Sequence, residues 1–380
     1  MRLHLYRNIK LIYVGFSSFI LGYILSYINT DICIIPTSQD VPDYDIILVI
    51  LTSPQNYHKR DAIRKTWLRL KDNINYNSFE STLDYMDVPI YNQEGFLKKD
   101  TTTIQKQRLI KYATKLKTDS AQLRPQKHFS RTRFKVKHLF SIGTNGLSTD
   151  IISSIKLENS KFDDILLLPS LNDSYRSLTN KIVQTFEKVS ILYKFKYILK
   201  CDDDSFIKLD TVIEELEAYD HNVMEIYKYN TSMPQLYWGY FNGAARVKHS
   251  GPWAEKEWFL CDRYLPYALG GGYILSAYLV KYIVNNDQHF SKFNSEDVSV
   301  GAWLAPLNNV YRRHDPRFNT EANPRKMSLL HIVLHKVSPM EMKSLLLDYK
   351  NEPYENINVE EVGYIYNWEV LPSKCYEHFI

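Results

Sequence analysis

Three apolar runs of strand length, separated along the chain by segments with helical spacing, constrain the fold of this sequence more than any other feature. The runs are DIILVILT at 45–52, DILLL at 164–168 and FKYILK at 195–200. Continuous apolar strands are typical of parallel sheets that are buried on both faces, and strands that alternate with helices are typical of α/β folds. The sequence therefore predicts an α/β fold with a mostly parallel central sheet flanked by helices.

Further elements are expected between and after these runs. Apolar side chains recur every three or four residues before the third run, which indicates a helix packed on the sheet. Ser338-Pro339-Met340-Glu341 has the form of a capping box with Pro at the first helical position. Helices are predicted at about 55–70, 151–157, 178–193 and 338–349, and a fourth strand at 134–142.

Residues 72–132 lose this periodicity and are rich in Asn, Lys, Thr, Gln and Asp, so we interpret them as a polar insertion. The second half, 101–133, carries nine Lys and Arg residues against the single Asp119. Such a charge run is typical of a solvated loop, and the alternative is a surface that binds an anionic glycan.

The first 43 residues predict a membrane anchor. Residues 11–30 carry no charge and form a run about long enough to cross a bilayer as a helix. Arg2, Arg7 and Lys10 precede this run. Positive charges stay on the cytosolic side. We therefore expect a cytosolic tail at 1–10, a transmembrane signal-anchor at 11–30, a short stem at 31–43 and a luminal domain at 44–380. A cleaved signal peptide is the alternative, although no small-x-small cleavage site follows the run.

Net charge, cysteine spacing and glycosylation sequons bear on which partners the protein binds and in which compartment it lies. The net charge is +4, too small to indicate a nucleic-acid-binding protein. The four cysteines, Cys33, Cys201, Cys261 and Cys375, form no C-x-x-C motif, which leaves one or two ordinary disulfides open. In a luminal domain, Asn172 and Asn230 would be candidate N-glycosylation sites, because each begins an N-x-S/T sequon.

The apolar strand at 195–200 runs into Cys201 and then into three consecutive aspartates, Asp202–Asp204. Ligand sites in open α/β sheets lie beyond the carboxyl ends of the strands. Alternate carboxylates at such a place can ligate one hard divalent cation, Mn²⁺ or Mg²⁺. A solvated turn is the alternative for any D-x-D, but the position after a buried strand favours a metal site.

Other segments offer catalytic or binding groups, each with a structural alternative. Glu296-Asp297 can supply a general base, or can be the acidic first turn of a helix. Gly270-Gly271-Gly272-Tyr273 allows close backbone approach to a ligand, or a tight turn between strands. Arg60, Arg64 and Trp67 share a helix face that can hold a diphosphate and stack a base, although Trp67 also fits an apolar core stripe. His314 is either a metal ligand or an exposed side chain.

Taken in order, these segments resemble the β-1,3-galactosyltransferase family of Golgi enzymes, glycosyltransferase family 31. The resemblance runs from about Asp45 to Lys336 and skips the insertion. It is closest to members that build the glycosaminoglycan–protein linker. It rests on ILTSPQNYHKRDAIRKTW, LLLPSLNDSYRSLTNKI, KYILKCDDDSFIKLD, YWGYF, LPYALGGGYILS, NSEDVSVGAWLAP and HDPRF.

The resemblance implies a GT-A type nucleotide-sugar transferase fold on a type II Golgi anchor, with UDP-galactose as donor and Mn²⁺ as cofactor. The implied acceptor is galactosyl-β-1,4-xylosyl-serine of a proteoglycan core protein, and the implied reaction is inverting. Where the family usually has Tyr-x-Asn, this chain has Tyr175-Arg176-Ser177, which removes one donor contact or glycan. The implied roles are as follows: catalytic base, Asp297; metal ligands, Asp202, Asp204 and His314; donor binding, Arg60, Arg64, Trp67, Tyr175, Lys181 and Asp203; acceptor or sugar binding, Trp238, Tyr267, Gly271, Gly272, Tyr273 and Glu296.

Three other functions remain to be separated from this one. A relative of the same family would use another donor, such as UDP-N-acetylglucosamine, or another acceptor. A non-catalytic, membrane-anchored carbohydrate-binding protein would need neither Asp204 nor Asp297. A glycoside hydrolase needs two carboxyl groups that flank the glycosidic bond, and the adjacent pair Glu296-Asp297 cannot flank one bond together.

Overall fold

The computed structural model of this chain describes residues 41–73, 89–121, 134–227, 233–258, 260–351 and 359–378. The chain divides into Met1–Pro42 and Asp43–Ile380, and only the second unit is described below. The predicted tail, anchor and most of the stem lie outside the described residues, as do Asn230 and Cys33. No helix in the described ranges is long and apolar enough to cross a membrane.

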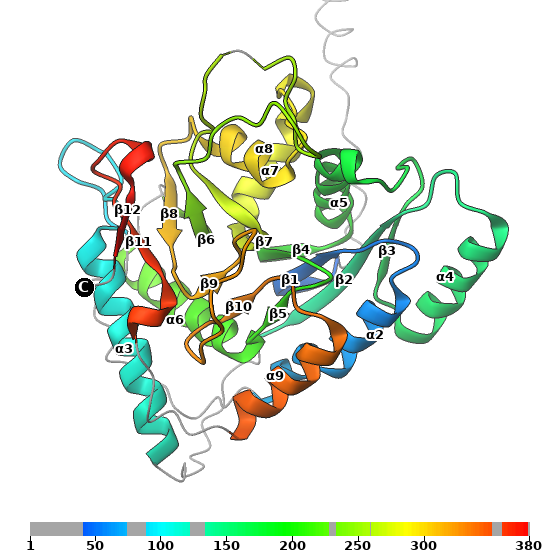
Figure 1. Ribbon diagram of the computed structural model, residues 1–380, viewed down its shortest axis with the longest axis horizontal. Coiled ribbons are helices and arrows are strands. Elements are labelled where there is room, and N and C mark those ends of the chain that lie inside the picture. The colour runs from blue at the N-terminus through cyan, green and yellow to red at the C-terminus, as the bar shows by residue number, and fades with distance from the viewer. Residues whose placement is uncertain are drawn as a thin grey trace, which may run out of the picture. The chain divides into compact units, whose positions relative to one another are not determined.

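A mixed seven-stranded sheet forms the centre of the second unit, in the order β3-β2-β1-β4-β7-β6-β8 (Figure 1). The pairs β3-β2, β2-β1, β1-β4 and β6-β8 are parallel, whereas β7 runs antiparallel to both of its neighbours. The prediction of a mostly parallel sheet flanked by helices is confirmed. The strands are β1 (Asp43–Leu51), β2 (Val136–Gly143), β3 (Ile165–Leu168), β4 (Lys194–Asp202), β6 (Gln235–Asn242), β7 (Tyr267–Ser276) and β8 (Val310–His314).

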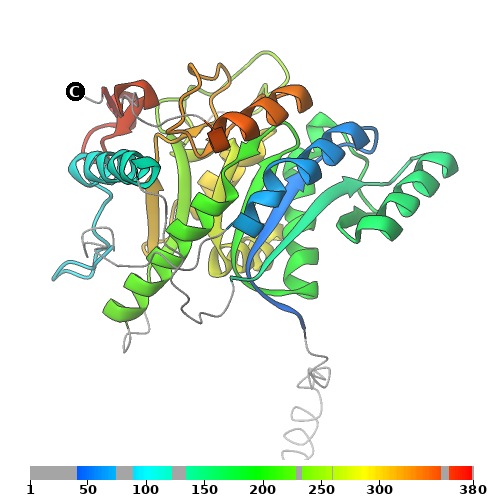
Figure 2. The same ribbon diagram turned by 90° about the horizontal axis from the view of Figure 1, so that it is seen from below.

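Helices cover both faces of this sheet, as Figure 2 shows from below. Alternate residues of β1 enter two separate cores, because successive side chains of a strand point to opposite faces. Ile46, Leu48 and Ile50 pack with residues of α2, α3, α6 and α9, and Ile47, Val49 and Leu51 pack with residues of α5, α7 and α8. The helices are α2 (Tyr57–Lys65), α3 (Thr102–Ala121), α4 (Thr149–Phe162), α5 (Leu178–Leu192), α6 (Leu209–Tyr227), α7 (Ala277–Asn286), α8 (Glu296–Leu304) and α9 (Pro339–Asn351).

Most predicted elements form where the pattern placed them. The helix predicted to reach about Leu70 is α2 followed by a 3-10 turn, Trp67–Asn73. The capping box that starts α9 is present, because the Ser338 backbone N–H donates to the Glu341 carboxylate and the Glu341 backbone N–H donates to the Ser338 hydroxyl.

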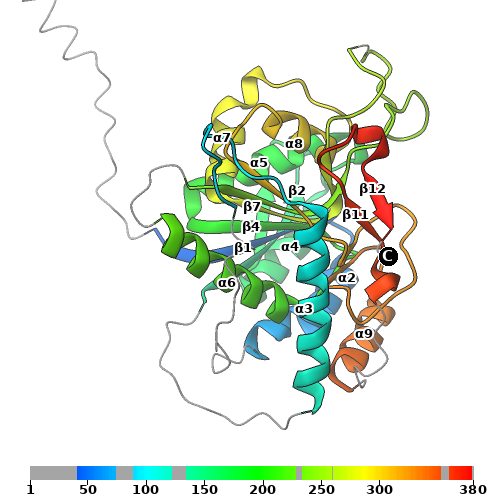
Figure 3. The same cartoon turned by 90° about the vertical axis from the view of Figure 1, so that its left-hand side faces the viewer.

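The interpretation of 72–132 as a solvated loop is wrong for α3. This 20-residue helix buries Leu109, Tyr112 and Ala113 in the core and lies beside the small sheet of β11 (Tyr364–Tyr366) and β12 (Tyr376–His378) (Figure 3). Gln105 fixes it there, because its side-chain amide donates to the Tyr366 carbonyl and accepts from the Tyr366 N–H. The polar composition hid this helix, since few apolar residues mark its buried side.

A second small sheet lies beside the carboxyl end of β4. It consists of β5 (Phe206–Ile207), β10 (Val333–Leu334) and β9 (Phe318–Asn319). The Val337 N–H donates to the Asp204 carbonyl at 2.8 Å, which ties the segment after β10 to the acidic turn after β4. This arrangement brings residues near 335 next to the aspartate triplet, although 130 residues separate them in the chain.

Candidate active site

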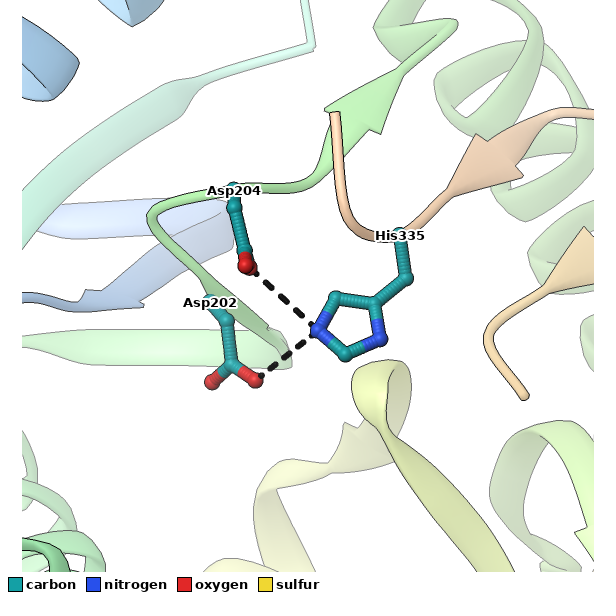
Figure 4. Close-up of side chains that lie close together, drawn as sticks. All are labelled: Asp202, Asp204 and His335. Atoms are coloured by element: carbon teal, nitrogen blue, oxygen red, sulfur yellow. Dashed lines mark ion pairs between the residues drawn. The ribbon is translucent and has the colours of Figure 1, made fainter. Parts of the chain in front are cut away.

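Asp202, Asp204 and His335 converge at the carboxyl end of β4 (Figure 4). Asp202 is the last residue of β4, Asp204 lies in the turn to β5, and His335 follows β10. The His335 Nε2 atom lies 3.5 Å from Asp202 Oδ2 and 3.3 Å from Asp204 Oδ1. One ligand atom from each residue lies within 4.8 Å of the others, which is a spacing suited to a shared cation.

The charges of this cluster are coupled, and His335 would have to release its proton before it could ligate a cation. Burial opposes ionisation of Asp202, but Lys200 and then His335 outweigh burial and lower its pKa to about 2. Burial likewise opposes a charge on His335, but Asp202 and Asp204 outweigh it and raise its pKa to about 9. In the described chain, His335 thus balances two carboxylates as an imidazolium. Two carboxylates and an imidazole form a donor set that suits a divalent first-row cation such as Mn²⁺.

The sequence pointed to a different histidine, and the structure corrects that prediction. His314 is completely buried at the end of β8, its Nδ1 accepts from the Phe241 N–H, and its Nε2 lies 2.9 Å from the Tyr364 carbonyl. Burial lowers the pKa of His314 to about 3. Both ring nitrogens are engaged in the core, so the histidine at the aspartates is His335.

Asp297 lies in the first turn of α8, close to the same edge of the sheet. Its Oδ2 accepts from the Gly270 N–H at 2.8 Å, and its Oδ1 accepts from the Val298 N–H at 2.9 Å. Burial raises the pKa of Asp297, while Lys200 and these two N–H groups oppose the rise. A half-buried carboxylate with a raised pKa has the properties of a general base.

Lys200 connects the aspartate cluster with the start of α8. Its ammonium lies 3.0 Å from Asp202 Oδ1, donates to the Gly270 carbonyl at 2.7 Å and contacts the Glu296 carboxylate. Burial opposes a charge on Lys200, but Asp202 and Glu296 outweigh it and raise its pKa. One buried cation therefore holds Glu296 and the backbone that supports Asp297.

The glycines of β7 leave room for His335 to lie beside the aspartates. Gly271 and Gly272 therefore have a packing role, whereas the sequence predicted a sugar-binding role for them. A Cβ on Gly271 would lie 2.6 Å from the His335 ring, and one on Gly272 would lie 2.8 Å from Val333. They form the interior of a strand rather than a tight turn. Bare backbone at these two positions allows β10 and His335 to approach the sheet.

The three aromatic residues predicted to bind a sugar lie in the core. Trp238 and Tyr273 are 0% exposed and Tyr267 is 7% exposed. Trp238 donates its indole N–H to Asp315, and its ring packs against Phe318. Their apolar faces pack against protein, so the structure corrects these predictions.

Arg60, Arg64 and Trp67, predicted to bind the donor, also serve the scaffold. Trp67 is 0% exposed in the core. Arg60 donates twice to the Glu158 carboxylate, at 2.9 and 2.6 Å. Arg64 donates to Asp164 and Glu158 at 2.7 to 2.8 Å. Both guanidiniums thereby join α2 to α4, and Arg64 also joins α2 to the residue before β3; this corrects the donor-binding prediction.

This assignment predicts the effect of Glu158→Gln. We expect the free energy of unfolding to fall by about 3–5 kcal/mol, because the buried Arg60 guanidinium loses the carboxylate it pairs with and Arg64 keeps only Asp164. Urea unfolding measures the loss. Glu214→Gln, which breaks an exposed pair with Lys115, is the matched control and should cost less than about 1 kcal/mol. If Glu158→Gln left the stability unchanged but weakened nucleotide binding, Arg60 and Arg64 would be assigned to the donor site instead.

The remaining donor-site candidates lie around the ends of β1 and β4. Both carboxylate oxygens of Asp203 accept from the segment after β1, at 2.7 Å each from Thr52, Asn56 and Lys59. Lys181 is buried and donates to the Thr52 carbonyl and to Asp173, both at 2.6 Å. Asp203 and Lys181 therefore brace this edge of the sheet. Tyr175 and Asn172 are exposed.

Comparison with known proteins gives a family match and several relatives. The galactosyltransferase family model matches residues 123–315, half of the chain. The chain is 40% identical over 238 residues to beta-1,3-galactosyltransferase 6 of Mus musculus, which covers 62% of this chain and 70% of the mouse protein.

Two other relatives match shorter parts of the chain. Hydroxyproline O-galactosyltransferase GALT5 of Arabidopsis thaliana is 35% identical over 199 residues, and UDP-GalNAc:beta-1,3-N-acetylgalactosaminyltransferase 2 of Xenopus tropicalis is 31% identical over 150 residues. These alignments cover 50% and 40% of this chain and 28% of each relative. The family match and the mouse relative lead to one conclusion: the chain belongs to the galactosyltransferase family, glycosyltransferase family 31, and is a hexosyltransferase.

Proposed function

We propose that this enzyme transfers galactose from UDP-galactose to O3 of the galactose in galactosyl-β-1,4-xylosyl-serine, a step in building the glycosaminoglycan–protein linker. The observation that carries the proposal is the 40% identity to mouse beta-1,3-galactosyltransferase 6 across 70% of that protein. The convergence of Asp202, Asp204, His335 and Asp297 at one edge of the sheet supports it. The fold is then of GT-A type, and the proteoglycan core protein that carries galactosyl-xylose is the partner.

The chemistry assigned to the residues is a single displacement. Asp297, as carboxylate, takes the proton from the acceptor O3 while that oxygen attacks C1 of the donor galactose. The attack comes from the face opposite UDP, so the α-linked donor gives a β-1,3 product without a covalent enzyme intermediate. The Gly270 and Val298 N–H groups orient the carboxylate, and Lys200 holds Gly270 from the other side.

Asp202, Asp204 and His335 are the residues that would hold Mn²⁺. When bound there, the cation neutralises the charge that develops on the departing diphosphate. Asp204 and His335 come from segments far apart in sequence, and the Val337–Asp204 backbone hydrogen bond keeps them together. This backbone contact would hold the carboxylate of Asp204 and the imidazole of His335 near one shared cation.

This assignment predicts that His335→Ala weakens Mn²⁺ binding at least about tenfold. Even the loss of a residue that only hydrogen-bonds to a metal ligand lowers metal affinity about 10–100-fold. Isothermal titration with Mn²⁺ measures the affinity directly. His314→Gln is the comparison variant and should leave the affinity for Mn²⁺ unchanged, because His314 lies in the core. The opposite pattern, with His314→Gln as the only weakened variant, would contradict the assignment.

The anchor and compartment complete the proposal. Residues 11–30 would form a single transmembrane helix that places residues 44–380 in the Golgi lumen as a type II membrane protein. Asn172 is exposed, as an N-glycosylated residue would have to be. Protease protection of the body in intact Golgi vesicles, together with sensitivity of the gel mobility to an endoglycosidase, tests both statements.

The experiment that tests the function uses residues from about Asp43 as a secreted protein, with Mn²⁺ and UDP-galactose. A galactosyl-β-1,4-xyloside is the acceptor, and plain galactosides, UDP-N-acetylgalactosamine, UDP-N-acetylglucosamine and a chelator are the controls. Chelator-sensitive β-1,3 transfer of galactose that prefers the xyloside is expected. Transfer from a different UDP-sugar, or only to a different acceptor, would contradict the proposed substrates. Specific binding of galactosides without any transfer would indicate a carbohydrate-binding protein instead.

A further inference from the structure

A cavity of about 450 Å³ opens beside the start of α8, between the segment at 251–258 and the segment at 291–294. Its volume lies within the range of 300–1,000 Å³ that is usual for small-molecule sites. No residue predicted from the sequence to bind a donor, acceptor or metal lines it. Its lining includes Arg176, Lys256, Glu257, Trp258, Lys292 and Asn294.

The walls of this cavity are fixed by hydrogen bonds and ring packing. The Asn294 N–H donates to the Glu255 carboxylate at 2.6 Å, and the Asn294 side chain donates to the Ala254 carbonyl at 2.8 Å. The indole of Trp258 packs against Phe293 with 4.5 Å between ring centroids. The two segments are therefore tied together, so the cavity is part of the folded structure.

The cavity adjoins the catalytic base through short chain connections. Asn294 precedes Asp297 by three residues, so their Cα atoms lie no more than about 11 Å apart. Tyr175, next to the cavity residue Arg176, packs edge-on against Trp253 with 5.6 Å between ring centroids. Trp253 lies between the cavity residues Pro252 and Ala254 in the chain, so the Tyr175–Trp253 pair is attached to the wall of the cavity at both of its residues.

The chemistry of the lining suits a sugar ring. Arg176, Lys256 and Glu257 are exposed, and within the described part of the chain no hydrogen bond or ion pair engages their side chains. They can donate to and accept from sugar hydroxyl groups. Trp258 adds partly exposed indole surface, and aromatic surface packs well against the C–H groups of a sugar.

We propose that this cavity is an acceptor subsite, which binds the second sugar of the acceptor while the terminal galactose lies at Asp297. The inference rests on the proposed function and adds to it a reason for preferring an acceptor of two sugars. Arg176 and Lys256 hold hydroxyl groups of the second ring, and Trp258 packs against it. The terminal galactose and the donor do not need these three residues.

The test compares two acceptors in the double variant Arg176→Ala/Lys256→Ala. With galactosyl-β-1,4-xyloside, KM should rise about tenfold or more, because two hydrogen bonds from charged groups are lost. With methyl β-galactoside, and for UDP-galactose, KM should stay unchanged. Lys343→Ala is the matched control, because Lys343 is an exposed lysine on α9. Since all three side chains are exposed, melting temperatures should agree with that of the unmodified protein.

An equal rise in KM for both acceptors, or none, would overturn the subsite. Absence of galactose transfer by the unmodified protein would overturn the proposed function separately. In that case, calorimetric titration of the same disaccharide, with UDP and Mn²⁺ present, tests independently of transfer whether the cavity binds the second sugar. Weaker binding by the double variant supports the subsite, and equal affinity refutes it.

Discussion

Asp297→Asn is expected to abolish galactose transfer almost completely while UDP binds with unchanged affinity. The amide keeps the size of the side chain but cannot take a proton from the acceptor, and general bases contribute about 10²–10⁴-fold to rates. A fall of that size in kcat, measured with saturating acceptor, is the expected result. Asp61→Asn is the matched control, because among the residues that the structure describes Asp61 forms only an exposed pair with Lys65 on α2.

The pH dependence gives a second readout for the same residue. The base must be ionised, and burial raises the pKa of Asp297 above the usual value for aspartate. As the pH falls through that raised pKa, kcat/KM should decline, and the decline should begin at a higher pH than an ordinary aspartate would give. Near-normal turnover by Asp297→Asn, or an acid limb that persists in it, would assign the base to another group.

Lys200→Met is expected to destabilise the protein and slow transfer together. Removing the ammonium leaves the buried Glu296 without its cation, and breaking a buried pair on one side costs about 3–5 kcal/mol. Gly270 also loses a hydrogen bond, so the carboxylate of Asp297 should shift, and a displacement of 1 Å can cost about 10²-fold in rate. Urea unfolding and kcat measure the two effects.

Two further variants separate these causes. Lys196→Met removes a half-exposed lysine of the same strand, which pairs with Asp45 and Asp220, and should have little effect on either property. Adding Glu296→Gln to Lys200→Met should restore part of the stability by removing the unpaired charge, without restoring kcat. Because Lys200 competes with a cation for Asp202, affinity for Mn²⁺ should not weaken in Lys200→Met. Stability equal to that of Lys196→Met would refute the assignment.

The fold could be predicted where local sequence decides it. The apolar runs became β1, β3 and β4, and the capping box at Ser338 starts α9, because burial on both faces and helix capping leave direct signals in sequence. Helix α3 escaped prediction although Leu109, Tyr112, Ala113 and Leu116 have helical spacing, because polar residues dominate the composition of this segment. The contact of Gln105 with Tyr366, which also fixes the helix, joins residues far apart in the chain and leaves no local signal.

The site could be predicted only in part, for the same reason. Asp202, Asp204 and Asp297 carry chemistry in short motifs, and the structure places them at one edge. Which histidine meets the aspartates depends on the pairing of β10 with β5, and that pairing is invisible in the sequence. Lys200 did leave a signal: a lysine inside a buried strand, directly before an acidic triplet, needs carboxylate partners.

The pairing of β10 with β5 has a consequence for any shortened form of this protein. The segment that the family model matches ends at residue 315, so it contains the acidic triplet and the base but neither His335 nor the strand that delivers it. A splice variant or protease product that stops there would retain the acidic triplet and Asp297. It would nevertheless lack His335, the imidazole of the proposed cation site. We would therefore expect weaker cation binding and lower activity than its motifs suggest.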